Sequence, residues 1–337
     1  MKKFVVAAAM LVGSSGVYAD GHGHHMRFDY DVSFDYNDHG YSKTDGYTPA
    51  KTTHVDQKSY LNFSGKVDDT LSYETYINIL AGSLDAATEV AKATKKMGMF
   101  SLAVGRDYLT MGGYDSKNAN FATIVLSPYT KYNLPAIGPN QVRFEGDFGG
   151  AGKVSFSLAQ DKVYSTAKTD TLQPAMLLEW TGTFGPVMPL VQIVQYDTNH
   201  SQQIAIGAGV QAAGLTAYLD YVMDSRASAP VGDASREKTS YSSIAVDVKY
   251  HTAAAVPFFK YTTFDAAQPG TDVKGNASTS GYEDNGQSMT LGVEMPCSGE
   301  SFLPYVAYVS NSQKVIEGTE EKSKSQSSIL LGFSGSI

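Results

Sequence analysis

The chain has 337 residues, of which 34 are Asp or Glu and 26 are Lys or Arg, so its net charge is −8. This acidic balance argues against a nucleic-acid partner, because such proteins neutralise phosphates with an excess of basic side chains. The single cysteine, Cys297, excludes an intramolecular disulfide and a zinc site made of several cysteines. No cofactor is indicated, and the 22 tyrosines and 32 glycines favour a turn-rich β protein.

Residues 1–19 have the pattern of a cleaved signal peptide. Lys2 and Lys3 precede an apolar run at 4–12, and a small-residue cleavage site ends at Ala19. The apolar run is well short of the ~20 residues that a membrane-spanning helix needs. We therefore expect export of a single mature domain, residues 20–337, to the periplasm, the medium or the outer membrane.

Cleavage after Ala19 would create a possible metal site at the new N-terminus. The terminal amine of Asp20, the following amides through Gly21 and the imidazole of His22 could supply four nitrogens to Cu(II) or Ni(II) in a square plane. A short histidine-rich tail without a metal role is the alternative.

The first element of the mature chain is a strand. At 26–36, apolar and aromatic side chains alternate strictly with Arg, Asp and Ser. Such alternation indicates a strand with one apolar and one polar face. A soluble β-sandwich and a membrane barrel both contain such strands.

The repetition of this pattern favours the barrel. Segments of nine to eleven residues match the length of a strand that crosses a bilayer at a tilt. Further strands are predicted at 54–66, 70–80, 99–107, 140–148, 152–161, 173–183, 187–197, 201–211, 214–224, 240–251, 255–265, 286–297, 301–311 and 325–337.

One segment has an ambiguous pattern. Residues 87–96 are rich in Ala, Glu and Lys, which favour a helix in isolation. A closed antiparallel bacterial barrel needs an even number of strands, and the other predicted strands number fifteen. We therefore predict that 87–96 is a strand, that a tight turn follows at 97–99, and that the barrel has sixteen strands.

The connections alternate in length. Tight turns are predicted at 67–69, 148–151, 184–186, 212–213, 252–254 and 298–300, and long polar loops at 37–53, 108–139, 162–172, 225–239, 266–285 and 312–324. Short turns on one rim and long loops on the other are typical of outer-membrane barrels.

The segment 96–108 resembles the general porins of Gram-negative bacteria. It has a glycine turn at Gly98, then Phe100, then a strand that ends in Gly105 and Arg106 before a long loop. The segments 140–150 and 60–65 also look like strands of that family. The resemblance implies a sixteen-stranded transmembrane antiparallel β-barrel, with its long third loop folded into the lumen.

The resemblance also implies a homotrimer in the outer membrane, in contact with lipid and lipopolysaccharide. Two features depart from the family. The usual terminal Phe is replaced by Ile337, and the chain has only five arginines, so the family's arginine cluster across the constriction is not reproduced in obvious form.

The loop at 108–139 is the candidate pore constriction. It is far longer than a hairpin connection, and such loops are usually functional or disordered. We expect Asp107 and Asp115 to face Arg106 and Arg143, with Glu145 beside them, so that a transverse field acts on passing solutes. An ordinary extracellular loop with solvated charges is the alternative.

The polar faces of the predicted strands indicate a charged lumen. Eight of eleven candidate charges are acidic, which predicts a weak preference for cations. The expected lumen-facing residues are Asp29, Asp31, Asp35, Glu74, Lys153, Glu179, Asp220, Asp247, Lys249, Lys260 and Glu294.

The sequence thus predicts a porin for passive diffusion of small hydrophilic solutes and ions. A substrate-selective channel and a closed structural barrel are the alternatives. An enzyme is not indicated, because none of the seven histidines has a Ser or Asp partner at motif spacing.

Overall fold

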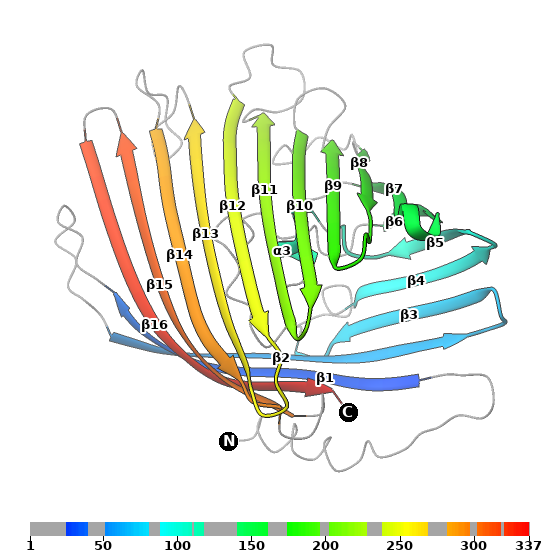
Figure 1. Cartoon of the computed structure of the whole chain (residues 1–337), viewed down its shortest axis with the longest axis horizontal. Helices are drawn as coiled ribbons and strands as arrows, with labels where there is room; N and C mark the ends of the chain where they lie inside the picture. Colours follow the sequence, from blue (N-terminus) through cyan, green and yellow to red (C-terminus); the bar gives the residue numbers. More distant parts are fainter. Residues whose placement is uncertain are drawn as a thin grey trace.

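The fold is a single sheet of sixteen antiparallel strands that closes into a barrel (Figure 1). The computed structural model describes residues 25–39, 51–80, 88–109, 111–117, 140–160, 174–195, 202–227, 238–268, 282–296, 302–317 and 320–336. Each strand pairs with its neighbours in the sequence, and β1 pairs with β16, which leaves no free edge. The predicted number of strands is confirmed.

The strands are β1 (His25–His39), β2 (Lys51–Lys66), β3 (Leu71–Asn78), β4 (Thr88–Met97), β5 (Phe100–Arg106), β6 (Asn140–Asp147), β7 (Lys153–Gln160), β8 (Pro174–Thr181), β9 (Val187–Gln195), β10 (Gln202–Ala212), β11 (Leu215–Ala227), β12 (Lys238–Tyr250), β13 (Val256–Gln268), β14 (Tyr282–Glu294), β15 (Leu303–Glu317) and β16 (Glu320–Ser336). In the described part of the chain, two short helices lie between them, α3 (Gly113–Lys117) and the 3-10 helix η2 (Gly149–Ala151).

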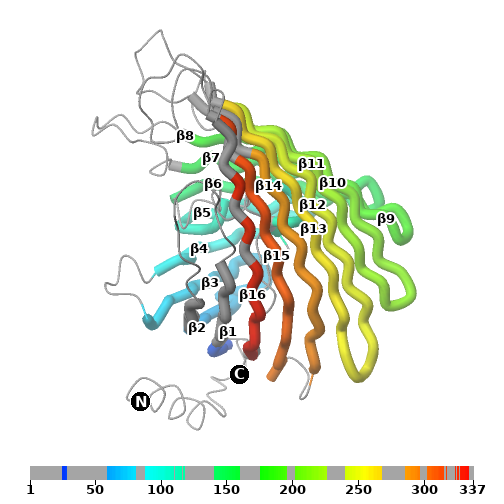
Figure 2. Tube along the Cα trace, turned by 90° about the vertical axis from the view of Figure 1, so that its left-hand side faces the viewer, coloured from blue at the N-terminus to red at the C-terminus, as the bar shows by residue number. Residues whose placement is uncertain are grey.

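The contact between the first and last strands closes the barrel. Val32 of β1 lies opposite Phe333 of β16, and this register continues along both strands. Figure 2 shows β16 between β15 and β1. Closure satisfies the backbone groups of both end strands, which a bilayer could not do because it offers no hydrogen bonds.

The segment with helical composition is strand β4. It pairs with β3 on one side and with β5 on the other, through the turn at Gly98 and Met99. The ladder hydrogen bonds on both sides outweigh the helix propensity of its Ala, Glu and Lys residues. A β-bulge near Tyr76 and Ile77 shifts the register and lets consecutive residues Glu89 and Val90 both be buried.

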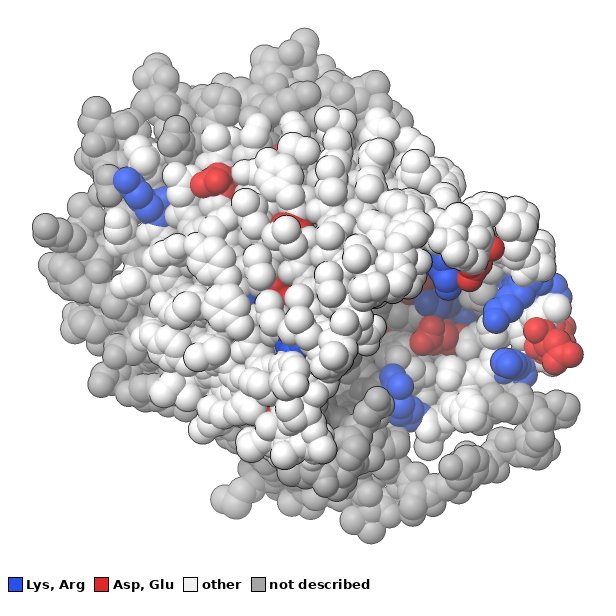
Figure 3. Space-filling view, viewed as in Figure 1, with Lys and Arg blue, Asp and Glu red and all other residues white. Residues whose placement is uncertain are grey.

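The two faces of the sheet have opposite character. The outer face exposes large apolar side chains, as on β7, where Phe156 and Leu158 are 43% and 42% exposed. The same strand turns Ser155 and Ser157 inward, and both are buried. Figure 3 shows a mostly uncharged surface over β10–β14, with more charged side chains gathered at the right of the view.

The short turns lie on one rim, and their conformations are specific. Between β10 and β11, Ala213 and Gly214 both have positive φ, at 49° and 84°, as in a type I′ hairpin turn. Between β8 and β9, Phe184 and Val187 pair across a turn that begins at Gly185, whose φ is 61°. The connections on the other rim all include residues outside those that the structure describes.

The predicted loop at 312–324 is wrong. β15 continues to Glu317 and β16 begins at Glu320, so most of this segment is a paired hairpin. The sequence of this segment is rich in Ser, Lys and Glu, so it lacks the apolar alternation on which the prediction depended. In the same way, β13 and β14 reach further into the predicted loop at 266–285.

Within the described ranges, no helix is long and apolar enough to cross a membrane. The predicted signal peptide and the N-terminal metal site at Asp20, Gly21 and His22 lie outside the described residues.

Candidate functional site

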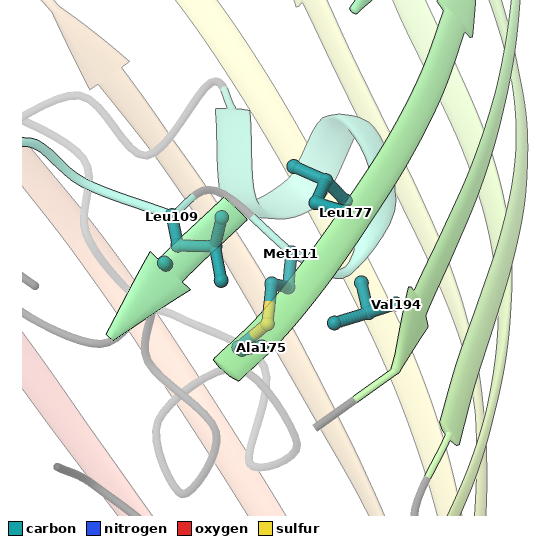
Figure 4. Close-up of a cluster of buried hydrophobic side chains, with 6 residues drawn as sticks. Leu109, Met111, Ala175, Leu177 and Val194 are labelled. Carbon is teal, nitrogen blue, oxygen red and sulfur yellow. The ribbon is translucent and has the colours of Figure 1, made fainter. Parts of the chain in front are cut away.

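The beginning of the third loop lies against the inner wall of the barrel. After β5, Leu109 and Met111 pack on an apolar patch formed by Leu177 of β8 and Val194 of β9, with the small side chains of Ala159 and Ala175 beside them (Figure 4). Leu109 and Met111 are 3% and 2% exposed. This part of the loop is therefore held to the wall by burial of apolar surface.

Helix α3 follows, and hydrogen bonds from its backbone and from the Tyr114 side chain bind it to β9. The Gly113 N–H donates to Oε1 of Gln192 at 3.0 Å. The Tyr114 hydroxyl donates to the carbonyl of Met188 at 3.0 Å, and its ring stacks on Tyr218 at 4.7 Å. Burial raises the pKa of Tyr114 to about 12, so the hydroxyl keeps its proton at neutral pH.

Asp115 connects α3 to two further strands. Its N–H donates to Oδ2 of Asp220 on β11 at 2.7 Å, and its carboxylate forms an ion pair with Lys260 of β13. The side chains of Asp115 and Lys260 are only 4% and 12% exposed. This pair is thus removed from most of the solvent, where ionic interactions are strong and an unpaired charge is costly.

The close approach of α3 to the wall requires glycine on both sides. A Cβ at Gly113 would lie 2.6 Å from the Asp220 carboxylate, and a Cβ at Gly207 of β10 would overlap the same group. A Cβ at Gly207 would also lie 3.0 Å from the Tyr114 ring. Small residues at these positions allow the loop backbone to lie directly on the strands.

The end of α3 returns toward β8. The Lys117 ammonium lies 2.5 Å from Oε1 of Glu179, and Gln192 donates to Oε2 of the same carboxylate. Glu179 is only 4% exposed, so it depends on these two partners to be buried as an anion. Arg143 of β6 lies 4.0 Å from Glu179 and 3.4 Å from Glu145.

The start of the loop is held by side chains of β4, which neighbours β5 on the side away from β6. Lys92 of β4 lies 2.9 Å from Asp107 and 3.2 Å from Glu74 of β3. The Tyr108 hydroxyl donates to Glu89, which the β4 bulge turns inward. Burial and this carboxylate raise the pKa of Tyr108 well above its usual value.

The structure places the predicted constriction residues in three separate groups. Asp107 lies beside Lys92, Asp115 beside Lys260, and Arg143 beside Glu145. The two aspartates that were expected to face Arg106 and Arg143 therefore form ion pairs with lysines. These lysines come from strands far from the loop in sequence, and no motif indicated their pairing.

Arg106 lies opposite Ala91 of β4 and Asn140 of β6 in the register of the sheet. Its Nε is buried, and the preceding Gly105 has a φ of 134°. The place of Arg106 in the constriction stays a prediction.

The other predicted lumen charges are on the inner face where the structure describes them. Lys249 lies 3.2 Å from Glu294 and 5.8 Å from the centre of the Phe258 ring. Asp247 lies opposite Lys260 in the register of β12 and β13. Asp29 and Asp31 belong to β1, but their side chains are outside the described part of the chain. Among the described residues, no group of three or more His, Cys, Asp or Glu side chains could hold a metal ion.

No known sequence family and no curated protein matches the chain. Solved structures match it over almost its whole length. The in-vitro folded outer membrane protein OmpT of Vibrio cholerae is 10% identical, with a TM-score of 0.65, and the match covers 96% of this chain and 100% of that one.

Two further matching structures are those of channels. The outer membrane channel DcaP of Acinetobacter baumannii is 14% identical, with a TM-score of 0.65 over 93% of this chain and 97% of that one. The anion-selective porin of Comamonas acidovorans is 12% identical, with a TM-score of 0.61 over 94% and 100%. The chain therefore has the fold of the outer-membrane porins. At these identities the likeness establishes the fold alone.

Proposed function

We propose that this protein is an outer-membrane porin, a water-filled channel through which small hydrophilic solutes and ions diffuse passively. The observation that carries this proposal is the opposite character of the two faces of the closed sheet. Ionised side chains line the inside, and several remain accessible there, such as Glu74 at 34% and Arg143 at 26%. The outside is apolar, as lipid requires.

The aromatic side chains at the short-turn rim support a position in a membrane. Phe100 stacks on Phe144 at 5.3 Å and meets Phe148 edge-on at 6.3 Å, and Trp180 lies 6.3 Å from Phe184. Aromatic girdles of this kind occur where a barrel wall passes from lipid to water. The short turns then lie on the periplasmic side and the long loops outside the cell.

The third loop forms the constriction in this proposal. Support comes from its described part, which contacts β8, β9 and β13. In this proposal the loop narrows the lumen at the level of α3. Asp107, Asp115, Arg143 and Glu145 line this region. They would act through their fields on solutes that pass within a few ångströms.

We further propose a weak preference for cations. Seven carboxylate side chains are buried among the described residues, whereas no Lys or Arg of the same residues is buried to that degree. Because most of these carboxylates have cationic or hydrogen-bonding partners, the remaining field is modest. A reversal potential in a salt gradient that shows anion preference would overturn this part of the proposal.

The remaining expectations complete the proposal. The protein is exported with its signal peptide 1–19 removed, residues 20–337 form one barrel domain, and three copies associate in the outer membrane among lipid and lipopolysaccharide. One of the matching structures is described as a trimer form. Cross-linking of the protein in native membranes tests the trimer, and N-terminal sequencing tests the cleavage. A copper titration of the authentic mature protein tests the site at Asp20, Gly21 and His22.

Planar-bilayer conductance with neutral solutes of graded size is the decisive experiment. Steps of uniform conductance that shrink when small sugars enter the pore are expected for an open channel. Saturable block by one solute class would instead indicate a substrate-selective channel. The absence of conductance from correctly folded protein would indicate a closed structural barrel. Lipase and protease assays on the same preparation are expected to be negative.

A further inference from the structure

Six charged side chains form a chain of ion pairs along the inner wall of β6–β8. They alternate in sign from the short-turn rim up to α3, and we call this chain the charge ladder. Its members, in order, are Asp147, Lys153, Glu145, Arg143, Glu179 and Lys117.

Each member of the ladder lies within ionic contact of the next. The five successive N–O distances are 3.6, 3.9, 3.4, 4.0 and 2.5 Å. The strand register holds the members in place, because Asp147 lies opposite Lys153, and Glu145 and Glu179 lie on either side of Ser155. Five of the six members therefore belong to the strands β6, β7 and β8, and only Lys117 belongs to α3.

Most of the ladder is accessible to a solute. The side chains of Lys153 and Asp147 are 55% and 51% exposed, those of Glu145 and Arg143 are 31% and 26%, and that of Lys117 is 24%. The pair of Lys92 and Glu74 is similarly accessible, at 23% and 34%, but two other inner ion pairs are more enclosed. Lys260 and Asp115 are 12% and 4% exposed, and Lys249 and Glu294 are 13% and 8%. Among the ion pairs of the described residues, the ladder is thus the longest continuous series of charges that a solute in the lumen can reach.

The ladder has no net charge, because it contains three acidic and three basic side chains. A simple ion that approaches one member is attracted by it and repelled by the next member about 4 Å away. These opposite interactions largely cancel for an ion of either sign. A solute that carries both charges a few bonds apart can contact two neighbouring members at once, with each of its charges next to an opposite one.

We propose that the charge ladder selects small zwitterions, such as free amino acids, over neutral solutes of the same size. The inference rests on the proposed function, since it assigns a preferred solute class to the same passage. The ladder supplies matched sites at each step between α3 and the rim. It thereby raises the local concentration of a dipolar solute without a single deep site that would trap it.

Swelling of liposomes that contain the folded protein tests the proposal. The probes are L-glutamine, a zwitterion, and L-arabinose, a neutral sugar of nearly equal mass, each corrected for entry into protein-free liposomes. We expect L-glutamine to enter at least about twofold faster than L-arabinose. Because both rates come from one preparation, their ratio is independent of the number of inserted pores.

Two variants separate the ladder from the pore itself. Arg143→Gln with Glu145→Gln removes the two central charges, and Arg143→Glu with Glu145→Arg keeps the composition but breaks the alternation. Both are expected to bring the ratio of the two rates close to one. Lys95→Gln with Asp69→Asn is the matched control, because it also removes one charge of each sign, but near the exposed turn between β2 and β3. The control is expected to keep the wild-type ratio.

The outcomes distinguish the inference from the proposed function. If L-arabinose enters but L-glutamine enters no faster, or if the two central variants keep the wild-type ratio, the ladder does not select zwitterions and the porin function stands. If neither probe enters liposomes that contain folded wild-type protein, the porin function fails and the inference fails with it.

Discussion

Asp115 of α3 and Lys260 of β13 form an ion pair inside the barrel that joins the third loop to a strand far away in the sequence. The Asp115 N–H also donates to Asp220 of β11 at 2.7 Å. One loop residue therefore contacts two strands on the side of the barrel that lies across from the start of the loop. The position of α3 depends on this contact more than on any local sequence preference.

Removal of the lysine from this pair should destabilise the protein. Lys260→Gln leaves Asp115 largely buried without its cation and next to Asp247 and Asp220, so we expect a loss of about 3 kcal/mol in the free energy of unfolding. The double variant Asp115→Asn with Lys260→Gln should lose clearly less than the sum of the two single variants. Urea unfolding in detergent micelles measures this, with the single tryptophan, Trp180, as the fluorescent probe. Strict additivity of the two substitutions would contradict a direct interaction.

A methyl group at Gly207 should push the loop away from the wall. The added Cβ would overlap the Asp220 carboxylate and approach the Tyr114 ring to 3.0 Å. We expect Gly207→Ala to cost about 1–3 kcal/mol in stability and to change the single-channel conductance. Gly150→Ala is the control, because a Cβ there meets nothing within 4 Å. Equal behaviour of the two variants would mean that α3 does not lie on β10.

A substitution in the turn between β10 and β11 should stabilise the protein. Ala213 has a φ of 49°, a conformation that alanine adopts only at a cost of about 1–2 kcal/mol. Asparagine tolerates this region, and Asn-Gly is the preferred pair for a type I′ turn. We expect Ala213→Asn to raise the free energy of unfolding by about 0.5–1 kcal/mol. Ala253→Asn, in the turn before β13, is the control and should give no gain.

The contribution of the turn between β2 and β3 to the stability of the protein should depend on pH. Hydrogen bonds from the Thr70 hydroxyl and from the N–H groups of Thr70 and Leu71 lower the pKa of Asp68 to about 2. A carboxyl with a lowered pKa in the folded state contributes stability above its unfolded pKa, and this contribution is lost as the pH falls toward 2.

The difference in stability between the wild type and Asp68→Asn should therefore be present at pH 5 and above, shrink below pH 4 and vanish near pH 2. The residue is fully exposed, so the effect is small, and carbon-13 NMR titration of the Asp68 carboxyl is the sensitive measurement. A midpoint near 4 would contradict the three hydrogen bonds. Asp69→Asn, next to it in the same turn, is the control.

The barrel could be predicted from the sequence because its signal is repeated in every strand. The outer positions must be apolar and the inner ones polar wherever lipid lies on one side and water on the other, so the alternation predicted the faces of Val154, Phe156 and Leu158 correctly. β4 could be predicted only from the closure of the whole sheet. The ends of β15 and β16 could not be predicted, because their Ser-, Lys- and Glu-rich sequence shows no apolar alternation.

The partners of the loop could not be predicted from the sequence. Glu179, Asp220 and Lys260 were expected in the lumen as wall charges, but their contacts with Lys117 and Asp115 depend on the path of the loop across the strands. No periodic pattern describes that path.

The described part of the third loop has a mechanical consequence. It is fixed beside β4 by Asp107, beside β8 and β9 by Leu109 and Met111, and to β13 by Asp115. A hollow tube of this kind flattens most easily when opposite walls move together or apart, and a tie between distant strands opposes that motion. We therefore expect the described part of the loop to oppose flattening of the barrel.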